Sequence, residues 1–142
     1  MTIYFYKSIE PYGYLNNFHK SKFIIYDLEW SNVEAAYQSR KTLVQKEIDE
    51  IYNSASPREA RNLGQLVKMR SDWDDIKCQV MKECVSAKFK QNLELAKRLL
   101  STENEDIVED SKIDFYWGCG ADGKGLNNLG KILMEVRSEL KK

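Results

Sequence analysis

The chain has 142 residues, which is enough for one domain with a sizeable core but hardly for two. Its 22 basic and 22 acidic residues give a net charge of zero, which excludes a bulk attraction to nucleic acid or to an anionic membrane. Three cysteines without a C-x-x-C pair and a single histidine exclude a disulfide framework and an imidazole metal site, and they favour a reducing, cytoplasmic compartment. No segment approaches the roughly 20 apolar residues that cross a bilayer, so we expect no membrane association.

The N-terminal part of the sequence predicts short strands followed by a helix. Residues 3–6 (IYFY) and 22–27 (KFIIYD) are short and rich in β-branched and aromatic side chains, a composition typical of strands. From Ser31 onward the apolar residues follow a helical spacing. Ser31 is expected to cap a helix that runs to about Thr42, and Glu34, three residues after the cap, would complete a capping box.

The rest of the sequence predicts further helices. Ser56-Pro57 combines a serine cap with proline in the first turn, Ser71 starts the next helix, residues 92–100 form another, and the last begins near Asn127. Their expected buried faces are Ile76, Val80, Cys84 and Ala87, then Leu95, Leu99 and Leu100, then Leu129, Ile132, Leu133, Val136 and Leu140. The predicted fold is a mainly helical α+β domain over residues 1–142, with a small sheet made largely from the N-terminal part.

The stretch from Asp114 to Lys131, DFYWGCGADGKGLNNLGK, satisfies two phosphate-loop patterns. Its G-x-G-x-x-G lacks the following βαβ unit of a dinucleotide-binding fold, because only one more helix is expected after it. Its G-x-x-x-x-G-K is followed by Gly125, where a P-loop has Ser or Thr to hold magnesium. We therefore exclude both readings.

The same stretch still favours a ligand site. Glycines allow a backbone to approach a ligand closely, and the free N–H groups at the start of the last helix predict an anion site. Glycines alone are more typical of a flexible turn. A carboxylate at Asp114 and an aromatic face at Trp117, directly before them, instead favour a nucleotide-like ligand.

A second group of candidates lies on the first helix. Glu34, Gln38 and Lys41 fall at i, i+4 and i+7, hence on one face. Spacing alone favours a solvated polar face for them. By the same measure Trp73, preceded by Arg70, is more typical of a core aromatic than of a ligand contact.

Taken together, segments spread along the chain resemble one known family. They are Tyr12-Gly13 with Leu15-Asn16-Asn17-Phe18, Trp30 to Glu34 with Tyr37-Gln38 and Lys41, Ser56-Pro57 with Gly64, Arg70, Trp73 and Asp74, and Glu109, Asp114, Trp117-Gly118, Gly125, Asn127 and Leu129-Gly130. Their order and spacing are similar to those of the YbiA-like, or NADAR, proteins over nearly the whole length.

The resemblance implies an N-glycosidase that cleaves the bond between ribose and nitrogen, without metal or cofactor. It implies small phosphorylated ribosylamino-pyrimidines of riboflavin synthesis as substrates, or ADP-ribose on modified guanine in DNA. The family's functional positions correspond to Glu34, Trp73, Asp114 and Trp117. Many relatives carry histidine after the glutamate, where this chain has Ala35.

The chemistry of the reaction suggests a role for each residue. A carboxylate stabilises the positive charge that develops on ribose or activates water, which we assign to Glu34. Asp114 would orient ribose or assist the leaving group, and the two roles could be exchanged. The expected substrate contacts are stacking by Trp73 and Trp117, contacts from Asn17, Gln38 and Asn127, and a 5′-phosphate held by backbone N–H groups around Gly118 and Gly120 with Arg70 or Lys41.

Three function classes remain open at this stage. The first is the small-molecule N-glycosidase. The second is an ADP-ribosyl hydrolase acting on DNA, which zero net charge disfavours and which a basic strip beside the Trp117 loop would support. The third is a non-catalytic nucleotide-binding module, which Ala35 favours but which would not need two acids beside an anionic ligand.

Overall fold

Helices are the main regular elements of the structure. The computed structural model describes residues 1–142. The helices are α1 (Val33–Ser39), α2 (Gln45–Tyr52), α3 (Pro57–Gly64), α4 (Trp73–Gln91), α5 (Leu93–Leu100) and α6 (Asn128–Leu140), with a short 3-10 helix at Gly13–Leu15. None of the helices is both long and apolar enough to span a bilayer.

Four short strands form two separate two-stranded sheets. β1 (Thr2–Phe5) pairs in parallel with β4 (Asp106–Glu109), and β2 (Phe23–Ile25) pairs antiparallel with β3 (Leu28–Trp30). The predicted α+β class is therefore confirmed, and three of the four strands lie in the N-terminal part. The strands form two small sheets where one was expected. The segment 22–27 is a strand only over Phe23–Ile25, because the chain turns back at Tyr26 and Asp27, both with positive φ.

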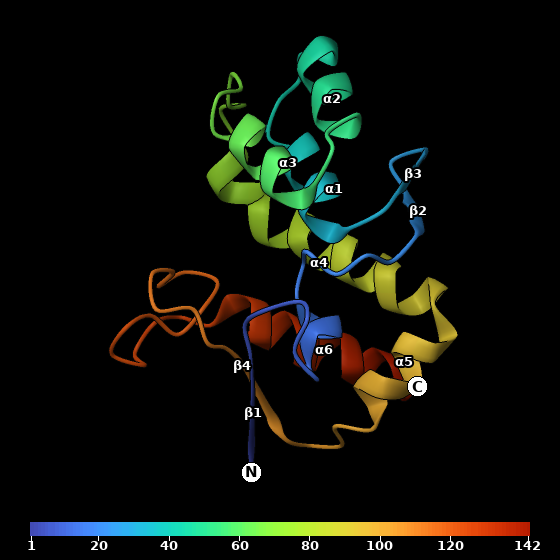
Figure 1. The fold of residues 1–142 in the computed structure, drawn as a ribbon, viewed down its shortest axis with the longest axis vertical. Helices are drawn as coiled ribbons and strands as arrows, with labels where there is room; N and C mark the ends of the chain where they lie inside the picture. The colour runs from blue at the N-terminus through green and yellow to red at the C-terminus, as the bar shows by residue number, and fades with distance from the viewer.

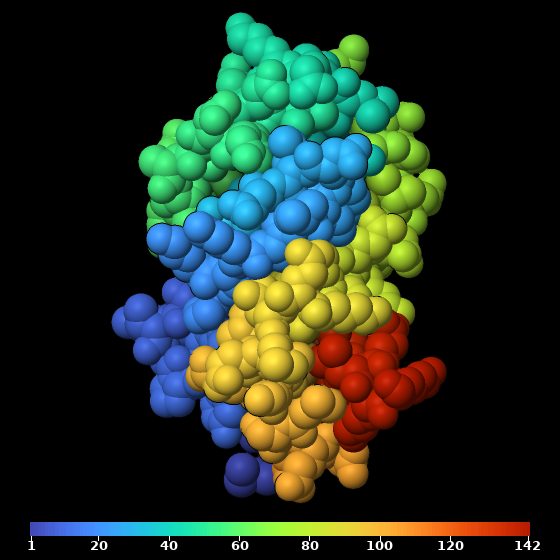
Figure 2. Space-filling model, turned by 90° about the vertical axis from the view of Figure 1, so that its right-hand side faces the viewer, coloured from blue at the N-terminus to red at the C-terminus, as the bar shows by residue number.

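The molecule is elongated, with helix α4 running through its middle (Figure 1). Helices α1, α2 and α3 pack at one end, whereas α5, α6 and the β1–β4 pair pack at the other. The segment 110–127, coloured orange, lies along one side between these two parts. On the opposite side, the β2–β3 hairpin fills the space between the two parts and contacts α4 (Figure 2).

The core joins both ends of the chain. Twenty-five buried side chains form one hydrophobic cluster, which includes Ile3 and Phe5 of β1, Ile107 of β4 and the centre of α4. The predicted α6 face is buried at Leu129, Ile132, Leu133 and Val136, and Leu140 packs against the cluster. Leu95 and Leu99 are buried as expected, whereas Leu100 is half-buried.

Two helix starts differ from the prediction. The residue that caps α1 is Asn32, whose side chain accepts a hydrogen bond from the Ala35 N–H, so Ser31 and Glu34 do not form a capping box. Helix α4 begins one residue later than expected, at Trp73. The cap at Ser56 is confirmed, since its Oγ accepts from the Glu59 N–H at 3.1 Å. Helix α2 was not predicted because its cap, Val44, carries no capping side chain.

Candidate active site

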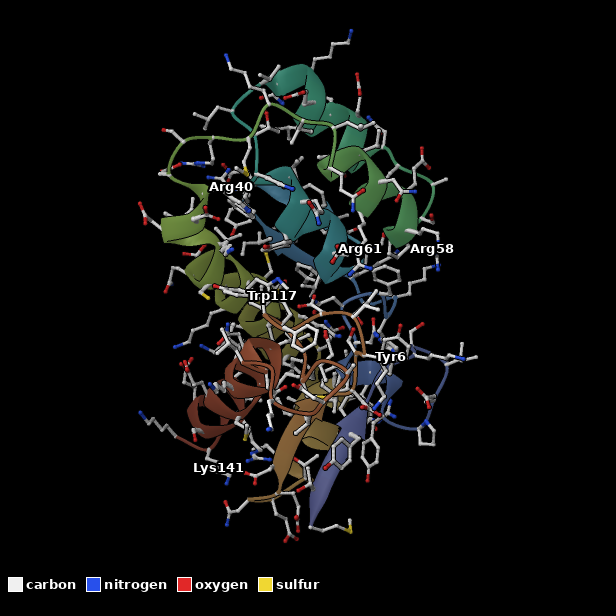
Figure 3. The ribbon with its side chains drawn as sticks, turned by 90° about the vertical axis from the view of Figure 1, so that its left-hand side faces the viewer. Tyr6, Arg40, Arg58, Arg61, Trp117 and Lys141 are labelled. Carbon is white, nitrogen blue, oxygen red and sulfur yellow. The ribbon has the colours of Figure 1, made fainter.

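A central cavity of about 1040 Å³ opens between the two parts of the molecule. Its walls come from α1, α3, the start of α4, residues 6–9 and 16–18, and the segment from Glu109 to Trp117. Figure 3 views the molecule from this side, with Trp117 and Tyr6 below α3. Because the size suits a small organic ligand, we take this cavity as the candidate active site.

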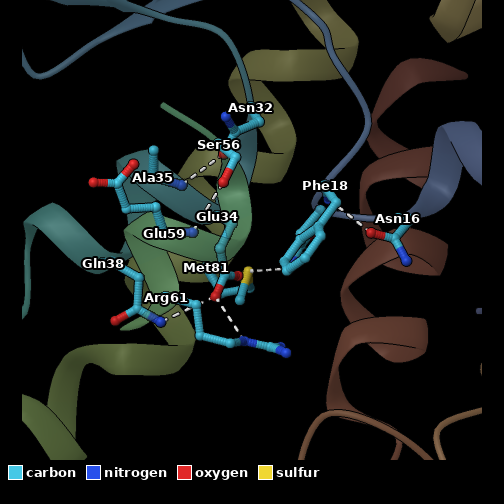
Figure 4. A network of polar contacts seen from close by, with 11 residues as sticks. Asn16, Phe18, Asn32, Glu34, Ala35, Gln38, Ser56, Glu59, Arg61 and Met81 are labelled. Carbon is cyan, nitrogen blue, oxygen red and sulfur yellow. Dashed lines mark hydrogen bonds and ion pairs between the residues drawn. The ribbon is translucent and has the colours of Figure 1, made fainter. Parts of the chain in front are cut away.

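Glu34 lies in the first turn of α1 and is 4% exposed. Its Oε1 accepts hydrogen bonds from Gln38 Nε2 at 3.0 Å and from Arg61 Nε at 3.3 Å (Figure 4). The positive end of the helix dipole also favours a negative charge at this position. Oε2 accepts no hydrogen bond and remains accessible at the cavity wall. The result is a held carboxylate with one oxygen left for a ligand or a water.

Asp114 reaches the same cavity from the other part of the molecule. Its Oδ1 accepts from the N–H groups of Tyr116 and Trp117, at 2.9 and 2.8 Å. The carboxylate thereby closes the turn that places Trp117 in the wall. Its second oxygen has no partner within the protein, so the predicted pair Glu34 and Asp114 does share one cavity.

Three aromatic side chains stand together in the cavity wall. Tyr37 lies between Trp73 and Trp117, with ring centroids at 5.1 and 5.7 Å. Trp73 is only 4% exposed, so it packs mainly in the core, whereas Trp117 is half-buried. Trp117 is consequently the ring with more surface for a ligand, and Tyr37, not predicted as a site residue, fixes its position.

Glu109 is a further acid that the sequence analysis did not assign to the site. It ends β4, lines the cavity and has a buried Oε2 without a hydrogen-bond partner. Burial raises the pKa of Glu109 to about 7. The negative charges of Asp114 and Glu34 act in the same direction, and the positive charge of Arg61 acts against them. The sequence signal for Glu109 was its place in the last of the family-like segments, but no strand had been predicted there.

Four of the predicted ligand residues do not line the central cavity: Arg70, Gly118, Gly120 and Asn127. Arg70 pairs with Asp72 at 2.6 Å and donates to the Arg40 carbonyl. Asn127 ties the loop to β4, since it accepts from the Glu109 N–H and donates to the Ile107 carbonyl. The Phe115 ring packs against Gly120, where a Cβ would lie 2.4 Å from a ring carbon.

The expected anion site at the start of α6 is occupied by the protein itself. The N–H groups of Asn127, Asn128 and Leu129 donate to the carbonyls of Gly118, Tyr116 and Trp117. The N–H groups of Cys119 and Gly125 are likewise bonded within the chain. The glycines therefore allow a tightly packed loop, and a phosphate would have to displace these bonds to reach the helix start.

Asn17, Gln38 and Lys41 do line the cavity, as predicted from the sequence. The Asn17 carbonyl accepts from the Glu34 N–H at 3.2 Å, and Asn17 Nδ2 donates to the sulfur of Met81. Gln38 orients Glu34, and Lys41 forms no ion pair. No group of three or more His, Cys, Asp and Glu side chains lies close enough together to hold a metal ion.

Comparison with known proteins gives the family. The model of the NADAR domain matches residues 4–141. The chain belongs to the NADAR family. N-glycosidase Npun_R5314 of Nostoc punctiforme is 44% identical over 146 residues, which cover 99% of this chain and 94% of that protein. N-glycosidase YbiA of Escherichia coli is 37% identical over 140 residues, with 97% and 88% covered.

The fold agrees with that assignment. The NMR structure of E. coli YbiA matches with a TM-score of 0.91 at 36% identity, covering 99% of this NADAR chain and 85% of the other. The riboflavin biosynthesis protein VVA0006 of Vibrio vulnificus is 37% identical over 140 residues, which cover 97% of this chain but 38% of that longer protein.

The departure at Ala35 lies outside the central cavity of this NADAR protein. Ala35 is 5% exposed and lines a smaller cavity of about 220 Å³, together with Asn32 and Tyr52. Successive residues of a helix point in different directions, so Glu34 and Ala35 face different cavities. Alanine here removes no group from the wall that carries Glu34, Glu109 and Asp114.

Proposed function

We propose that this protein is an N-glycosidase that hydrolyses the ribose–nitrogen bond of a phosphorylated ribosylamino-pyrimidine. Relatives that match nearly the whole chain are named N-glycosidases, and a longer relative is named a riboflavin biosynthesis protein. One observation of the structure carries the proposal. Two glutamates, Glu34 and Glu109, line one cavity in different environments: Glu34 forms an ion pair with Arg61, whereas Glu109 forms no ion pair and has a buried oxygen without a hydrogen-bond partner.

Glu34 acts on the sugar side of the bond. Breaking the ribose–nitrogen bond leaves positive charge on the anomeric carbon, and a fixed carboxylate stabilises that charge. Arg61 and Gln38 hold Glu34 Oε1, so Oε2 is the atom that faces ribose or receives a proton from the attacking water. The water oxygen then bonds to the anomeric carbon as the nitrogen leaves.

Glu109 acts on the leaving group. A neutral carboxylic acid donates the proton that the departing nitrogen needs, and a pKa near 7 keeps a large share of this group protonated at neutral pH. Asp114, with one oxygen fixed by the turn, orients the ribose hydroxyls. This arrangement moves leaving-group assistance from Asp114, where the sequence had placed one option, to Glu109. Trp117 stacks on the pyrimidine ring.

The test is substitution of Glu34 by glutamine. We expect Glu34→Gln to lower kcat for release of ribose 5-phosphate by about 100-fold or more, because the charge opposite the developing cation is lost. Mass spectrometry of the released sugar measures it. Glu50→Gln is the matched control, since Glu50 is exposed on α2 and lies outside the cavity. Unchanged turnover by a folded Glu34→Gln variant would remove the residue from the mechanism.

The volume of the cavity supports a second substrate, ADP-ribose on modified guanine in DNA. At about 1040 Å³ it lies at the upper end of the range for small-molecule sites and has room beyond a single ribosylamine phosphate. The same assay with ADP-ribosylated DNA, followed by mass spectrometry of released ADP-ribose, gives the kcat/KM for this substrate, to be compared with that for the ribosylamino-pyrimidine. A higher kcat/KM on the DNA substrate would replace the first proposal by the second.

A further inference from the structure

Four cations line the central cavity, and three of them form no ion pair. Arg58 and Arg61 lie one turn apart on α3, Lys41 follows α1, and Lys7 follows β1. Figure 3 shows both arginines at the lower edge of α3, above Tyr6. Arg58, Lys41 and Lys7 have no carboxylate within ion-pair distance, although three acids share the cavity with them.

Arg61 is engaged through one nitrogen only. Its Nε donates to Glu34, while its guanidinium carbon lies 5.2 Å from the centre of the Phe18 ring, which holds the group in place. Both Nη atoms remain without a partner in the protein. Gln65, one further turn along the same face of α3, also lines the cavity and makes no side-chain hydrogen bond. Free N–H donors therefore gather on the α3 wall.

Elsewhere the lysines and arginines that form ion pairs do so with surface acids. Lys82 and Lys90 share Glu139, and Lys112 pairs with Asp110. Lys7, Lys41 and Arg58 share the cavity with acids and do not pair with them. A cluster of unpaired cations within reach of a ligand site is complementary to an anion, and arginines match the oxygens of a phosphate with paired N–H groups.

We propose that Arg58 and Arg61, with Lys41, form the anion subsite of the central cavity and bind the phosphomonoester of the substrate. The identity of the ligand as a ribose phosphate rests on the proposed function; the subsite does not. The phosphate then lies on the α3 wall, and ribose extends from it toward Glu34. This replaces the glycine loop as the phosphate site, since Gly118 and Gly120 do not line the cavity and the N–H groups of Asn127, Asn128 and Leu129 are already bonded.

The probe is ribose 5-phosphate, measured by calorimetric binding, which requires no turnover. We expect Arg58→Ala to weaken its binding by about 10-fold or more, because a charged hydrogen-bond donor is lost. Arg58→Lys retains the charge without the paired donors, so its affinity for ribose 5-phosphate should lie between those of the wild type and Arg58→Ala. Arg58 is exposed and has no partner, so its replacement leaves the fold intact. Lys124→Ala, in the glycine loop and outside the cavity, is the matched control and should bind as the wild type does.

The outcomes separate the subsite from the proposed reaction. Equal binding by wild type and Arg58→Ala overturns the subsite, as does loss of binding in Lys124→Ala or no binding by the wild type. Binding that depends on Arg58, without hydrolysis of any ribosylamine substrate, supports the subsite and overturns the proposed function. If hydrolysis occurs, Arg58→Ala should raise KM for the phosphorylated substrate by a larger factor than it lowers kcat.

Discussion

At the scale of single residues, two glutamates of the site have different surroundings. Glu34 has a cation and an amide as hydrogen-bond donors on one oxygen, and its other oxygen is free. Glu109 has burial and the negative charge of Asp114, which favour its neutral form. Paired acids of this kind serve as base and acid in the hydrolysis of glycosidic bonds.

The leaving group provides a sharp test of this division. When the substrate is an N-ribosylpyridinium phosphate, the leaving group departs as a neutral pyridine and needs no proton. We expect Glu109→Gln to lower the rate by about 100-fold for an amine leaving group and by far less for the pyridinium, whereas Glu34→Gln slows both. Steady-state kinetics with the two substrates measures this. Equal losses on both substrates in Glu109→Gln would contradict the role of Glu109 as proton donor.

The same proton predicts the pH dependence of the wild-type rate. With the amine substrate, kcat/KM should decline as the pH rises through about 7, because Glu109 loses the proton that it must donate. With the pyridinium substrate this decline should be absent. A pH profile measured with both substrates checks the expectation, and identical declines would assign the titration to another group.

At the scale of elements, the packing of α1 against α3 sets the position of Glu34. Gln38 on α1 lies directly over Gly64 at the end of α3, and a Cβ on Gly64 would be 2.0 Å from Gln38 Oε1. Only a residue without a side chain permits the two helices to approach with Gln38 between them. Gln38 Nε2 then points to Glu34, and Arg61 reaches the same carboxylate from α3.

Gly64→Ala, a change on α3, should therefore disturb catalysis through Gln38 and Glu34 on α1. The added methyl group displaces Gln38, so we expect kcat to fall with little change in KM, and the free energy of unfolding to fall by about 1–3 kcal/mol. The double variant Gly64→Ala with Gln38→Ala removes the clash, and its stability loss should be smaller than the sum of the single losses. Denaturant titration of the three variants measures this, and additive losses would show that the clash is absent.

At the scale of the whole molecule, the cavity exists because distant parts of the chain meet. The parallel pairing of β1 with β4 brings the N-terminal strand beside a segment about a hundred residues later, with Phe5 opposite Glu109. Helix α4 then connects the part that carries Glu34 to the part that carries Glu109 and Asp114. Global stability and the site are consequently linked through the buried acid.

This link predicts how stability depends on pH. The pKa of Glu109 is raised from 4.5 to about 7 in the folded state. Between these values the folded protein keeps a proton that the unfolded chain has released, so the contribution of Glu109 to the free energy of unfolding falls as the pH rises, and it is constant above this range. We therefore expect the free energy of unfolding of the wild type, minus that of Glu109→Gln, to fall from pH 4.5 to 7 in urea denaturation. A difference that rises or stays flat would contradict the buried, neutral state of Glu109.

The sequence alone determined the features that depend on neighbours along the chain. Helical spacing predicted the buried faces of α4 and α6, and the Ser56 cap identified the start of α3, because capping and periodicity are local properties. The ordered motifs indicated the family, and with it Glu34, Asp114, Trp73 and Trp117 as candidates. All four line the central cavity.

The tertiary structure alone decided which groups line the cavity and what surrounds each of them. Strand β4 forms through pairing with β1, so Glu109 and its burial were invisible in the local pattern. The glycine loop was expected to hold phosphate, but Gly118 and Gly120 do not line the cavity, and the N–H groups of Asn127, Asn128 and Leu129 are bonded to carbonyls of that loop. Arg58 and Arg61 become ligand candidates only because α3 packs beside α1. Burial, unpaired charge and occupied donors are properties of packing, and packing joins residues that lie far apart in the sequence.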